Sequence, residues 1–168
     1  MTPDLFSIPG PWTGKLAIAT RPRGGDWLDD EAAGWLRAGL NVIVSLLEDD
    51  EAAQLGLALE GGAASACGIQ FVSFSIPDRG VPSSVSDSLL LIKKISSQLE
   101  SGRNVAVHCR QGIGRSGLIA ASLLASSGME LESAIQTVSF VRGLTIPETP
   151  EQLRWLRQLP IEKLVSTV

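Results

Sequence analysis

Tyrosine is absent from this chain of 168 residues, histidine occurs once and cysteine twice. Basic side chains number 14 against 18 acidic ones, for a net charge of −4. A nucleic-acid-binding surface normally needs a basic excess, and the same balance argues against attraction to an anionic membrane. No apolar run reaches the roughly 18 residues of a membrane span, and the first residues lack the pattern of a secretory signal. A single histidine leaves little for a metal site, so neither a metal ion nor another cofactor is expected.

The two cysteines, without a secretory signal, indicate free thiols in a reducing cytoplasm. The length fits one compact domain, and hydrophobic residues make up 44% of the chain, so residues 1–168 are predicted to form a single domain. Four β-rich runs lie at residues 15–20, 41–47, 69–76 and 104–109, with helical patterns between them. This alternation predicts an α/β fold with a central, mostly parallel, twisted sheet of about four to five strands flanked by helices.

The helical patterns fall at residues 29–40, 51–66, 82–102, 115–128, 130–143 and 149–159. The second is weaker, because Gly61 and Gly62 interrupt it. The third has a periodic apolar face, formed by Val85, Leu89, Ile92, Ile95 and Leu99. In the last, Thr149 is the expected cap, Pro150 the first helical residue, and Gln152 the residue that closes a capping box.

The stretch "VHCRQGIGRSG", residues 107–117, concentrates the chemistry of the chain. It follows a predicted buried strand and precedes a predicted helix, the place where α/β sheets bind ligands. Gly112 and Gly114 allow backbone conformations in which successive N–H groups point inward, and a helix N-terminus near Arg115 adds unsatisfied donors. We therefore predict a phosphate-binding loop between a central strand and a helix, formed by Arg110, Gln111, Gly112, Ile113, Gly114 and Arg115.

Cys109 would lie at the base of this loop, where the same positive field favours a thiolate, the nucleophilic form of cysteine. Arg115 offers a planar fork that can grip two phosphate oxygens. The departing oxygen needs a proton, and Asp78, in "FSIPDRGVP", is the candidate acid. The interval from Asp78 to Cys109 leaves room for one helix and one strand. Pro-Asp-x-Gly is also a turn signal by itself, so Asp78 could be a plain turn residue.

At these residues the sequence resembles the cysteine-dependent protein phosphatases: "HCRQGIGRS" fits their signature and "IPDRG" their mobile acid loop. Chain size and the position of the acid look most like the small dual-specificity phosphatases. The resemblance implies that Cys109 is the nucleophile, Arg115 the phosphate and transition-state binder, and Asp78 the acid and then the base. It also implies that Ser116 hydrogen-bonds the thiolate in the second step, and that His108 orients the loop and tunes the sulfur.

The resemblance further makes Gln152 a candidate water-positioning residue, although the capping box explains it equally well. Other positions depart from particular branches of the family. Ile76 stands where the tyrosine-specific branch has tryptophan, and Arg110 and Ile113 replace two lysines of the lipid-directed branch. Gln111 stands where alanine is usual. The expected substrate is a phosphorylated protein, on tyrosine and on serine or threonine, or a small phosphomonoester.

Other interpretations of the same residues stay open. The loop could be a glycine-rich turn with a buried, inert cysteine, and a rhodanese-like sulfurtransferase or an arsenate reductase would also use a cysteine loop. Asp78 and the late position of Cys109 count against both enzymes. A catalytically silent phosphoprotein-binding module usually loses the cysteine, the arginine or the aspartate. Arg79 touches substrate or pairs with a carboxylate, and Cys67 is a core residue or a disulfide partner of Cys109.

Overall fold

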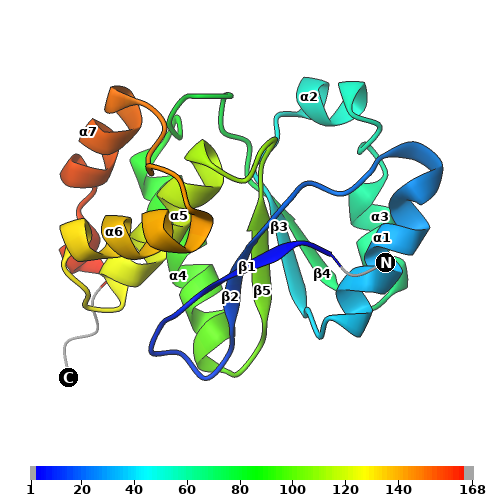
Figure 1. The fold of residues 1–168 in the computed structure, drawn as a ribbon, viewed down its shortest axis with the longest axis horizontal. Coiled ribbons are helices and arrows are strands. Elements are labelled where there is room, and N and C mark those ends of the chain that lie inside the picture. Colours follow the sequence, from blue (N-terminus) through cyan, green and yellow to red (C-terminus); the bar gives the residue numbers. More distant parts are fainter. Residues whose placement is uncertain (1–2, 165–168) are drawn as a thin grey trace.

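A five-stranded sheet forms the centre of the protein in the computed structural model, which describes residues 3–164 (Figure 1). The strand order is β1-β2-β5-β3-β4, and every neighbouring pair is parallel except β1–β2. The strands are β1 Leu5–Ile8, β2 Leu16–Ala19, β3 Val42–Ser45, β4 Gln70–Ser73 and β5 Val105–His108. The predicted mostly parallel sheet of four to five strands is confirmed.

β1 is the one strand that no sequence pattern indicated. It has four residues and pairs antiparallel with β2, from Leu5 opposite Ala19 to Ile8 opposite Leu16. A run this short, followed at once by Pro9 and Gly10, has too few positions to show a period of two. Because β1 lies at the edge of the sheet and is only partly buried, it does not need a continuous run of apolar residues.

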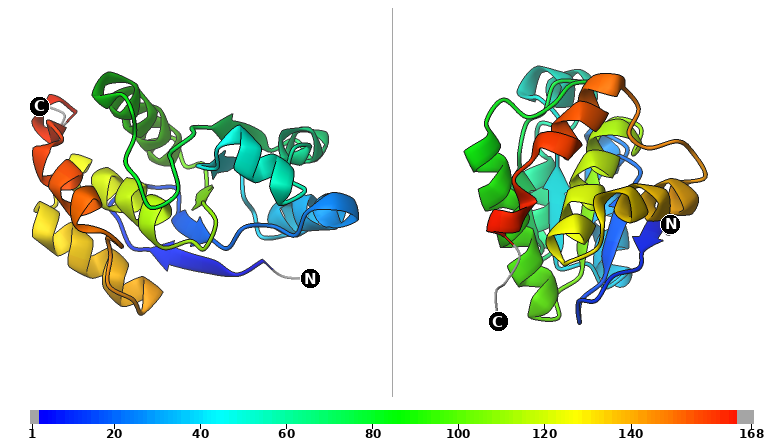
Figure 2. Two further views of the ribbon diagram at one scale, coloured as in Figure 1. Left: turned by 90° about the horizontal axis from the view of Figure 1, so that it is seen from above. Right: turned by 90° about the vertical axis from the view of Figure 1, so that its left-hand side faces the viewer.

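Helices cover both faces of the sheet (Figures 1 and 2). α1 and α3 lie on one side, and α4, α5, α6 and α7 gather on the other, while α2 stands above the carboxyl ends of the parallel strands. The bounds are α1 Leu28–Arg37, α2 Asp49–Gln54, α3 Glu60–Ala66, α4 Val85–Glu100, α5 Gly114–Ser126, α6 Leu131–Arg142 and α7 Pro150–Gln158, with short 3-10 turns at Gly25–Trp27 and Ile161–Lys163.

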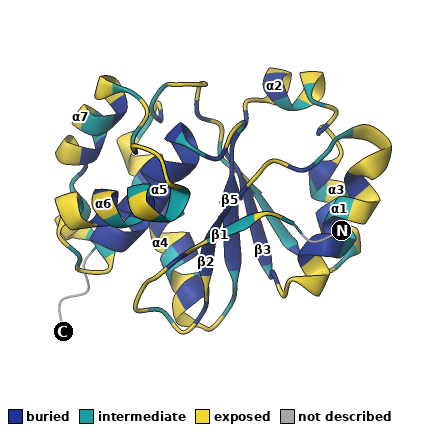
Figure 3. Ribbon diagram, in the orientation of Figure 1, coloured by how far each residue is buried: buried dark blue, intermediate teal, exposed yellow. Residues whose placement is uncertain are grey.

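The core follows the alternation of side chains along the central strands (Figure 3). Val42 and Val44 of β3 belong to the larger cluster with α4 and α5, whereas Ile43 between them belongs to the cluster with α1 and α3. All four residues of β2, β3 and β5 are buried. The loop after β5 therefore begins from a strand that is buried along its whole length.

The predicted helix over residues 51–66 is wrong in its form, because two helices occupy this region. α2 ends at Gln54, a turn with Gly56 at φ +72° follows, and α3 begins at Glu60. Gly61 and Gly62 lie inside α3 and do not interrupt it. The space at Gly61 is taken by Phe71, since an added Cβ would lie 3.0 Å from the aromatic ring.

The predicted apolar face of the long helix is only partly correct. Ile92, Ile95 and Leu99 of α4 are buried, but Val85 is exposed and Leu89 only half-buried. The helix rotates its buried face toward Leu91. In contrast, the capping of α7 is as predicted, with Pro150 in the first turn. No helix within residues 3–164 is both long enough and apolar enough to cross a membrane.

Candidate active site

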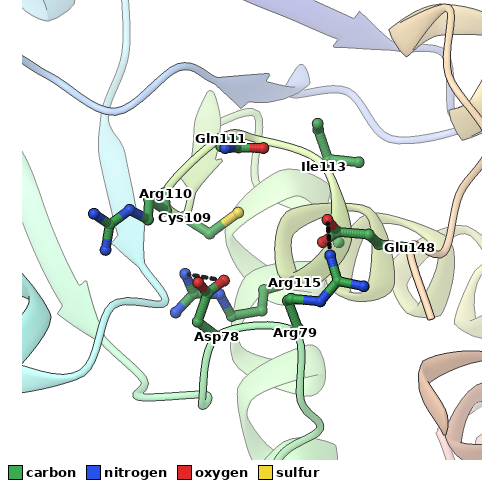
Figure 4. Close-up of a pocket in the computed structure, with 9 residues that line it drawn as sticks. Asp78, Arg79, Cys109, Arg110, Gln111, Ile113, Arg115 and Glu148 are labelled. Carbon is green, nitrogen blue, oxygen red and sulfur yellow. Dashed lines mark hydrogen bonds and ion pairs between the residues drawn. The ribbon is translucent and has the colours of Figure 1, made fainter.

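The pocket above β5 contains most of the predicted site residues (Figure 4). It has a volume of about 170 Å³ and lies where β5 leads through the loop 109–113 into the N-terminus of α5. Nine residues line it: Asp78, Arg79, Cys109, Arg110, Gln111, Ile113, Gly114, Arg115 and Glu148. The position agrees with the general rule for ligand sites in parallel sheets.

Carbonyl groups of the loop 109–113 are bonded from outside the pocket by two arginines. Arg142 of α6 donates from Nε to the Gly112 carbonyl at 2.6 Å and from Nη2 to the Gln111 carbonyl at 3.4 Å. Arg21, from the segment after β2, donates to the Arg110 carbonyl at 2.9 Å. In a trans peptide the N–H points opposite to the C=O. The next three N–H groups along the loop are therefore directed the other way, as an anion cradle requires.

The two loop glycines have different roles. Gly112 has φ +69°, the left-handed conformation that glycine adopts most easily. Gly114 has no positive φ, so the predicted conformational reason is wrong there. A Cβ on Gly114 would instead lie 2.7 Å from the Glu148 carboxylate and 3.1 Å from Nε2 of Gln152. Glycine at this position lets the segment before α7 approach the start of α5.

Cys109 lies at the base of the pocket, buried and not in a disulfide. Ser116, in the first turn of α5, is fully buried, and among the described residues its Oγ has no hydrogen-bond partner. Nε of Arg115 is in the same situation. Buried polar atoms rarely stay unpaired, so two such atoms beside one loop mark a place where a polar ligand can bind.

His108 is held beneath the loop by a carboxylate. Its Nε2 faces both oxygens of Glu60, with Oε2 at 3.1 Å, and both side chains are almost completely buried. Two acceptors on one ring nitrogen place the hydrogen on Nε2. On the other side of the ring, Nδ1 lies 3.4 Å from the carbonyl oxygen of Cys109. The imidazole is thus anchored to Glu60 through Nε2, and its other edge lies next to the backbone carbonyl of Cys109.

Arg115 has a partner that the sequence did not reveal. Its Nη1 and Nη2 donate to Oε1 and Oε2 of Glu51, in α2, at 2.7 and 2.8 Å. Nη1 also donates to the Ile76 carbonyl at 2.9 Å. Nothing in "EDDE" distinguished Glu51 from its neighbours, because acidic residues are ordinary in the first turn of a helix. The guanidinium is fixed by a two-pronged contact, the strongest type of side-chain ion pair.

Charge at the base of the pocket is stabilised by this pair. The hydrogen bond from Arg115 lowers the pKa of the Glu51 carboxyl, and the charges of Arg115 and Arg110 add to this effect against the opposing effect of burial. For Arg115, burial alone would lower the pKa. The hydrogen bond to Glu51 and the negative charges of Cys109, Glu51 and Asp78 outweigh burial and raise the pKa. Both groups are therefore ionised in the folded protein.

Asp78 reaches the pocket from a strand that is not adjacent to β5. It follows β4, and β3 lies between β4 and β5. The chain after β4 runs along the end of β3, where Ile76 donates its N–H to the Leu46 carbonyl at 3.1 Å. It thereby brings Oδ1 of Asp78 to 3.2 Å from Nη2 of Arg115 (Figure 4).

The acid loop is attached to the segment before α7. Arg79, a non-glycine residue at φ +60°, forms an ion pair with Glu148 at 2.9 Å. Of the two roles considered for Arg79, pairing with a carboxylate is the one observed. Nε2 of Gln152 donates to the Gly80 carbonyl at 3.0 Å, while its Oε1 accepts from the N–H groups of Glu148 and Thr149. The capping role of Gln152 is confirmed, and its water-positioning role stays a prediction.

Cys67 lies away from this machinery. It is half-buried at the end of α3 and packs against the cluster that contains Trp35 and Ile69. Cys109 belongs to the other cluster. The core role predicted for Cys67 agrees with this packing.

A mostly parallel sheet that presents Cys-x₅-Arg between its central strand and a helix defines the class of cysteine-dependent phosphatases. The comparisons with known proteins agree: residues 19–129, more than half of the chain, match the family described as "Polymorphic toxin system, DSP-PTPase phosphatase". The chain therefore belongs to the dual-specificity and tyrosine phosphatase family.

Curated relatives show the same similarity. The chain is 33% identical over 129 residues to "Protein tyrosine phosphatase domain-containing protein 1" of Danio rerio, covering 71% of this chain and 18% of the relative. The Mus musculus protein of that name is 35% identical over 133 residues, 74% of this chain and 17% of the relative. "Cyclin-dependent kinase inhibitor 3" of Rattus norvegicus is 32% identical over 85 residues, 49% of this chain and 40% of the relative. The chain thus spans less than half the length of these relatives.

Solved structures share the fold. A kinase associated phosphatase with serine in place of its catalytic cysteine has a TM-score of 0.88 at 19% identity, covering 100% of this chain and 99% of that chain. The active form of Tk-PTP has a TM-score of 0.72 at 29% identity, covering 87% and 91%. The similarity to the first structure concerns the fold alone, whereas the second structure is similar in both fold and sequence.

Proposed function

We propose that this protein hydrolyses phosphomonoesters, chiefly phosphotyrosine and phosphoserine or phosphothreonine in proteins, through a cysteinyl-phosphate on Cys109. One observation carries the proposal: a single pocket contains the buried sulfur of Cys109, the guanidinium of Arg115 and the carboxylate of Asp78. A nucleophile, a phosphate ligand and a proton donor are what this reaction requires.

In the first step, the thiolate of Cys109 attacks phosphorus, so an S–P bond forms while the P–O bond to the leaving group breaks. Asp78 enters this step as the carboxylic acid, without its ion pair to Arg115, and gives its proton to the departing oxygen. The inward N–H groups of the loop and the Arg115 guanidinium stabilise charge on the three equatorial oxygens. Glu51 holds the guanidinium in place, since its two oxygens engage both terminal nitrogens.

In the second step, Asp78, now a carboxylate, takes a proton from water as the water attacks phosphorus. The S–P bond breaks, inorganic phosphate forms and Cys109 leaves as a thiolate. We assign to the unpaired Oγ of Ser116 the hydrogen bond that stabilises this thiolate. The buried Glu60 carboxylate holds the His108 imidazole next to the peptide of Cys109, which fixes the ring beside the nucleophile.

The substrates that fit this proposal are phosphorylated proteins and small phosphomonoesters, without a metal ion or other cofactor in the reaction. We also expect the reaction to take place in the cytoplasm. Two unpaired cysteines, one of them the nucleophile, are compatible with a compartment that keeps thiols reduced.

Turnover with a chelator present is the direct test. Purified protein with EDTA should hydrolyse p-nitrophenyl phosphate and peptides that contain phosphotyrosine, phosphoserine or phosphothreonine. Rapid acid quenching after mixing with a ³²P-labelled peptide should trap label on Cys109, identified by mass spectrometry. Cys67→Ser is the matched control, since it removes the chain's other thiol and should leave both results unchanged.

The test also separates the competing functions. Absence of turnover on every substrate, with phosphopeptides still bound, would overturn the hydrolase and favour the phosphoprotein-binding module. Turnover without label on Cys109 would overturn the covalent mechanism. Sulfur transfer from thiosulfate to cyanide, with no phosphatase activity, would instead indicate a rhodanese-like enzyme.

A further inference from the structure

Positive charge is unevenly distributed around the mouth of the pocket. In the view of Figure 4, Arg110 extends to one side of Cys109, and the Arg79–Glu148 pair lies on the other side. Arg79 is neutralised by Glu148 at 2.9 Å, and Arg115 by Glu51 at 2.7 Å. Among the arginines that line the pocket within residues 3–164, Arg110 alone forms no hydrogen bond with a carboxylate.

Arg110 is held near a carboxylate that is already fully engaged. Its Nη1 lies 3.8 Å from Oε2 of Glu51, beyond hydrogen-bond distance, and its side chain is 41% exposed. Both oxygens of Glu51 accept bonds from Arg115 at 2.7 and 2.8 Å. The five donors of the Arg110 guanidinium thus remain largely available at the pocket wall.

Arg21 continues the positive surface beyond Arg110. It is exposed, and its Nη1 donates to the Arg110 carbonyl, which places the two residues side by side. Within residues 3–164, Arg21 forms no ion pair with a carboxylate. The neighbouring Arg23 differs, because Glu31 binds it at 2.6 Å.

A second pocket, of about 200 Å³, begins at Arg21 and is less suited to anions. Its lining includes Arg21 and Arg23 but also Asp4 and Glu31, so its formal charges cancel. Arg21 on the wall of this pocket and Arg110 on the wall of the first lie side by side, and within residues 3–164 neither forms a hydrogen bond with a carboxylate. We define these two residues as the arginine ridge.

We propose that the arginine ridge binds a second anionic group of a phosphopeptide, a carboxylate or a phosphate next to the scissile phosphate. This inference rests on the proposed function, because it assigns the substrate class of the same site. Residues of an extended peptide are about 3.3 Å apart, so side chains within two positions of the phosphorylated residue lie within reach. A phosphopeptide with acidic neighbours is therefore preferred over one with neutral or basic neighbours.

The size of the preference follows from exposed charges. Exposed ion pairs are weak, and two of them acting together correspond to about three- to tenfold tighter binding. A neighbouring phosphate should bind the ridge more tightly than a carboxylate does, because it carries about two charges and three acceptor oxygens. Screening should reduce the preference at high salt, since the Debye length shortens to about 3 Å at 1 M.

Binding to the Cys109→Ser protein tests the ridge independently of turnover. Four phosphotyrosine peptides of one sequence are compared by fluorescence anisotropy, with flanking aspartate, phosphoserine, alanine or lysine. We expect the aspartate and phosphoserine peptides to bind about three- to tenfold more tightly than the alanine peptide, and the lysine peptide to bind more weakly. Tighter binding of the phosphoserine peptide than of the aspartate peptide would identify a phosphate as the better occupant.

Charge removal then locates the preference. Arg21→Gln and Arg110→Gln keep hydrogen-bond donors but remove the charge. Each should reduce the ratio of the affinity for the aspartate peptide to the affinity for the alanine peptide. In the double variant this ratio should be close to one. Arg157→Gln, an exposed arginine of α7 paired with Glu132, is the matched control and should leave the ratio unchanged. If Arg110→Gln does not fold, Arg21→Gln decides alone, since Arg21 lies outside the loop.

Equal binding of the aspartate and alanine peptides would overturn the ridge, and so would a preference that survives the double variant. Failure of the proposed function looks different. Wild-type protein would then turn over no substrate, p-nitrophenyl phosphate included, while the affinities of the four peptides would still show whether the ridge binds a second anion.

Discussion

Glu51→Gln is the substitution that examines the architecture of the site most directly. Glu51 is almost fully buried and accepts two bonds from Arg115, at 2.7 and 2.8 Å. Glutamine has the same shape but retains one acceptor oxygen, and its NH₂ group meets a guanidinium that also only donates. One of the two bonds is lost, and the charge that balances a buried cation is removed.

The loss should be measurable in stability and in catalysis. Hydrogen bonds to charged groups contribute about 1.5–3 kcal/mol, and breaking a buried pair by removing one partner costs about 3–5 kcal/mol. Since glutamine keeps one acceptor, we expect the free energy of unfolding to fall by about 2–3 kcal/mol. Without Glu51 the Arg115 guanidinium is no longer held in one position. We expect kcat/KM for p-nitrophenyl phosphate to fall by about 10–100-fold, because a small displacement of a group at the reacting centre slows the reaction strongly.

Urea unfolding followed by tryptophan fluorescence gives the stability, and initial rates give kcat/KM. Glu31→Gln is the control, because it breaks an ion pair of similar length, to Arg23 at 2.6 Å, that is more exposed. That change should alter the free energy of unfolding by about 0–1 kcal/mol and leave kcat/KM unaffected. If Glu51→Gln behaves like Glu31→Gln in both assays, Glu51 does not position Arg115.

The pH dependence of stability gives the same prediction an independent measure. The pKa of the Glu51 carboxyl is lowered in the folded protein from the ordinary value of 4.5, chiefly by its hydrogen bond with Arg115. Its contribution to stability is therefore complete above pH 4.5 and is lost as the pH falls through the folded-state pKa. The free energy of unfolding of Glu51→Gln should decline less steeply below pH 4.5 than that of the wild type.

Three further substitutions test the proposed reaction. Cys109→Ser should reduce the turnover rate by more than about a thousandfold, while calorimetry should still detect binding of inorganic phosphate. A turnover rate within tenfold of the wild type would contradict the assignment of Cys109 as the nucleophile. Asp78→Asn should slow phosphoserine peptide hydrolysis by about 10²–10⁴ but p-nitrophenyl phosphate hydrolysis clearly less, and equal losses would make it a turn residue. Arg142→Gln, which weakens the 2.6 Å bond to the Gly112 carbonyl, should reduce phosphate affinity several-fold, whereas unchanged affinity would show that the loop keeps its shape unaided.

The sheet and its carboxyl-end pocket were predictable because their signals are local. Each central strand is an apolar run, and the run 104–109 leads straight into the glycine-rich loop, so the position of Cys109 followed from its neighbours. Thr149 and Gln152 occupy a capping pattern that the structure reproduces. β1 and the division between α2 and α3 escaped prediction, because both depend on where a short segment packs.

The residues that support the loop were not predictable for a different reason. Glu51 lies 64 positions from Arg115, and Glu60 lies 48 positions from His108. Each is an acidic residue near the start of a short helix, where acidic residues are ordinary. Only the topology of the sheet, which puts α2 and α3 near the end of β5, distinguishes them from the other acidic residues of the chain.

The loop after β5 also depends on side chains that lie outside the sequence motif. The residues 108–116 supply the thiol, the guanidinium and the backbone donors, but the loop's outward carbonyls are bonded by Arg21 and Arg142. A peptide of this sequence without those partners would leave its carbonyls free and its N–H groups without a common direction. The proposed anion site thus depends on three distant segments, and Arg21 belongs to both the loop's support and the arginine ridge. A substrate that binds the ridge would therefore contact the side chain that also bonds the proposed phosphate-binding loop, which would couple recognition of the neighbouring anion to the geometry of the reacting one.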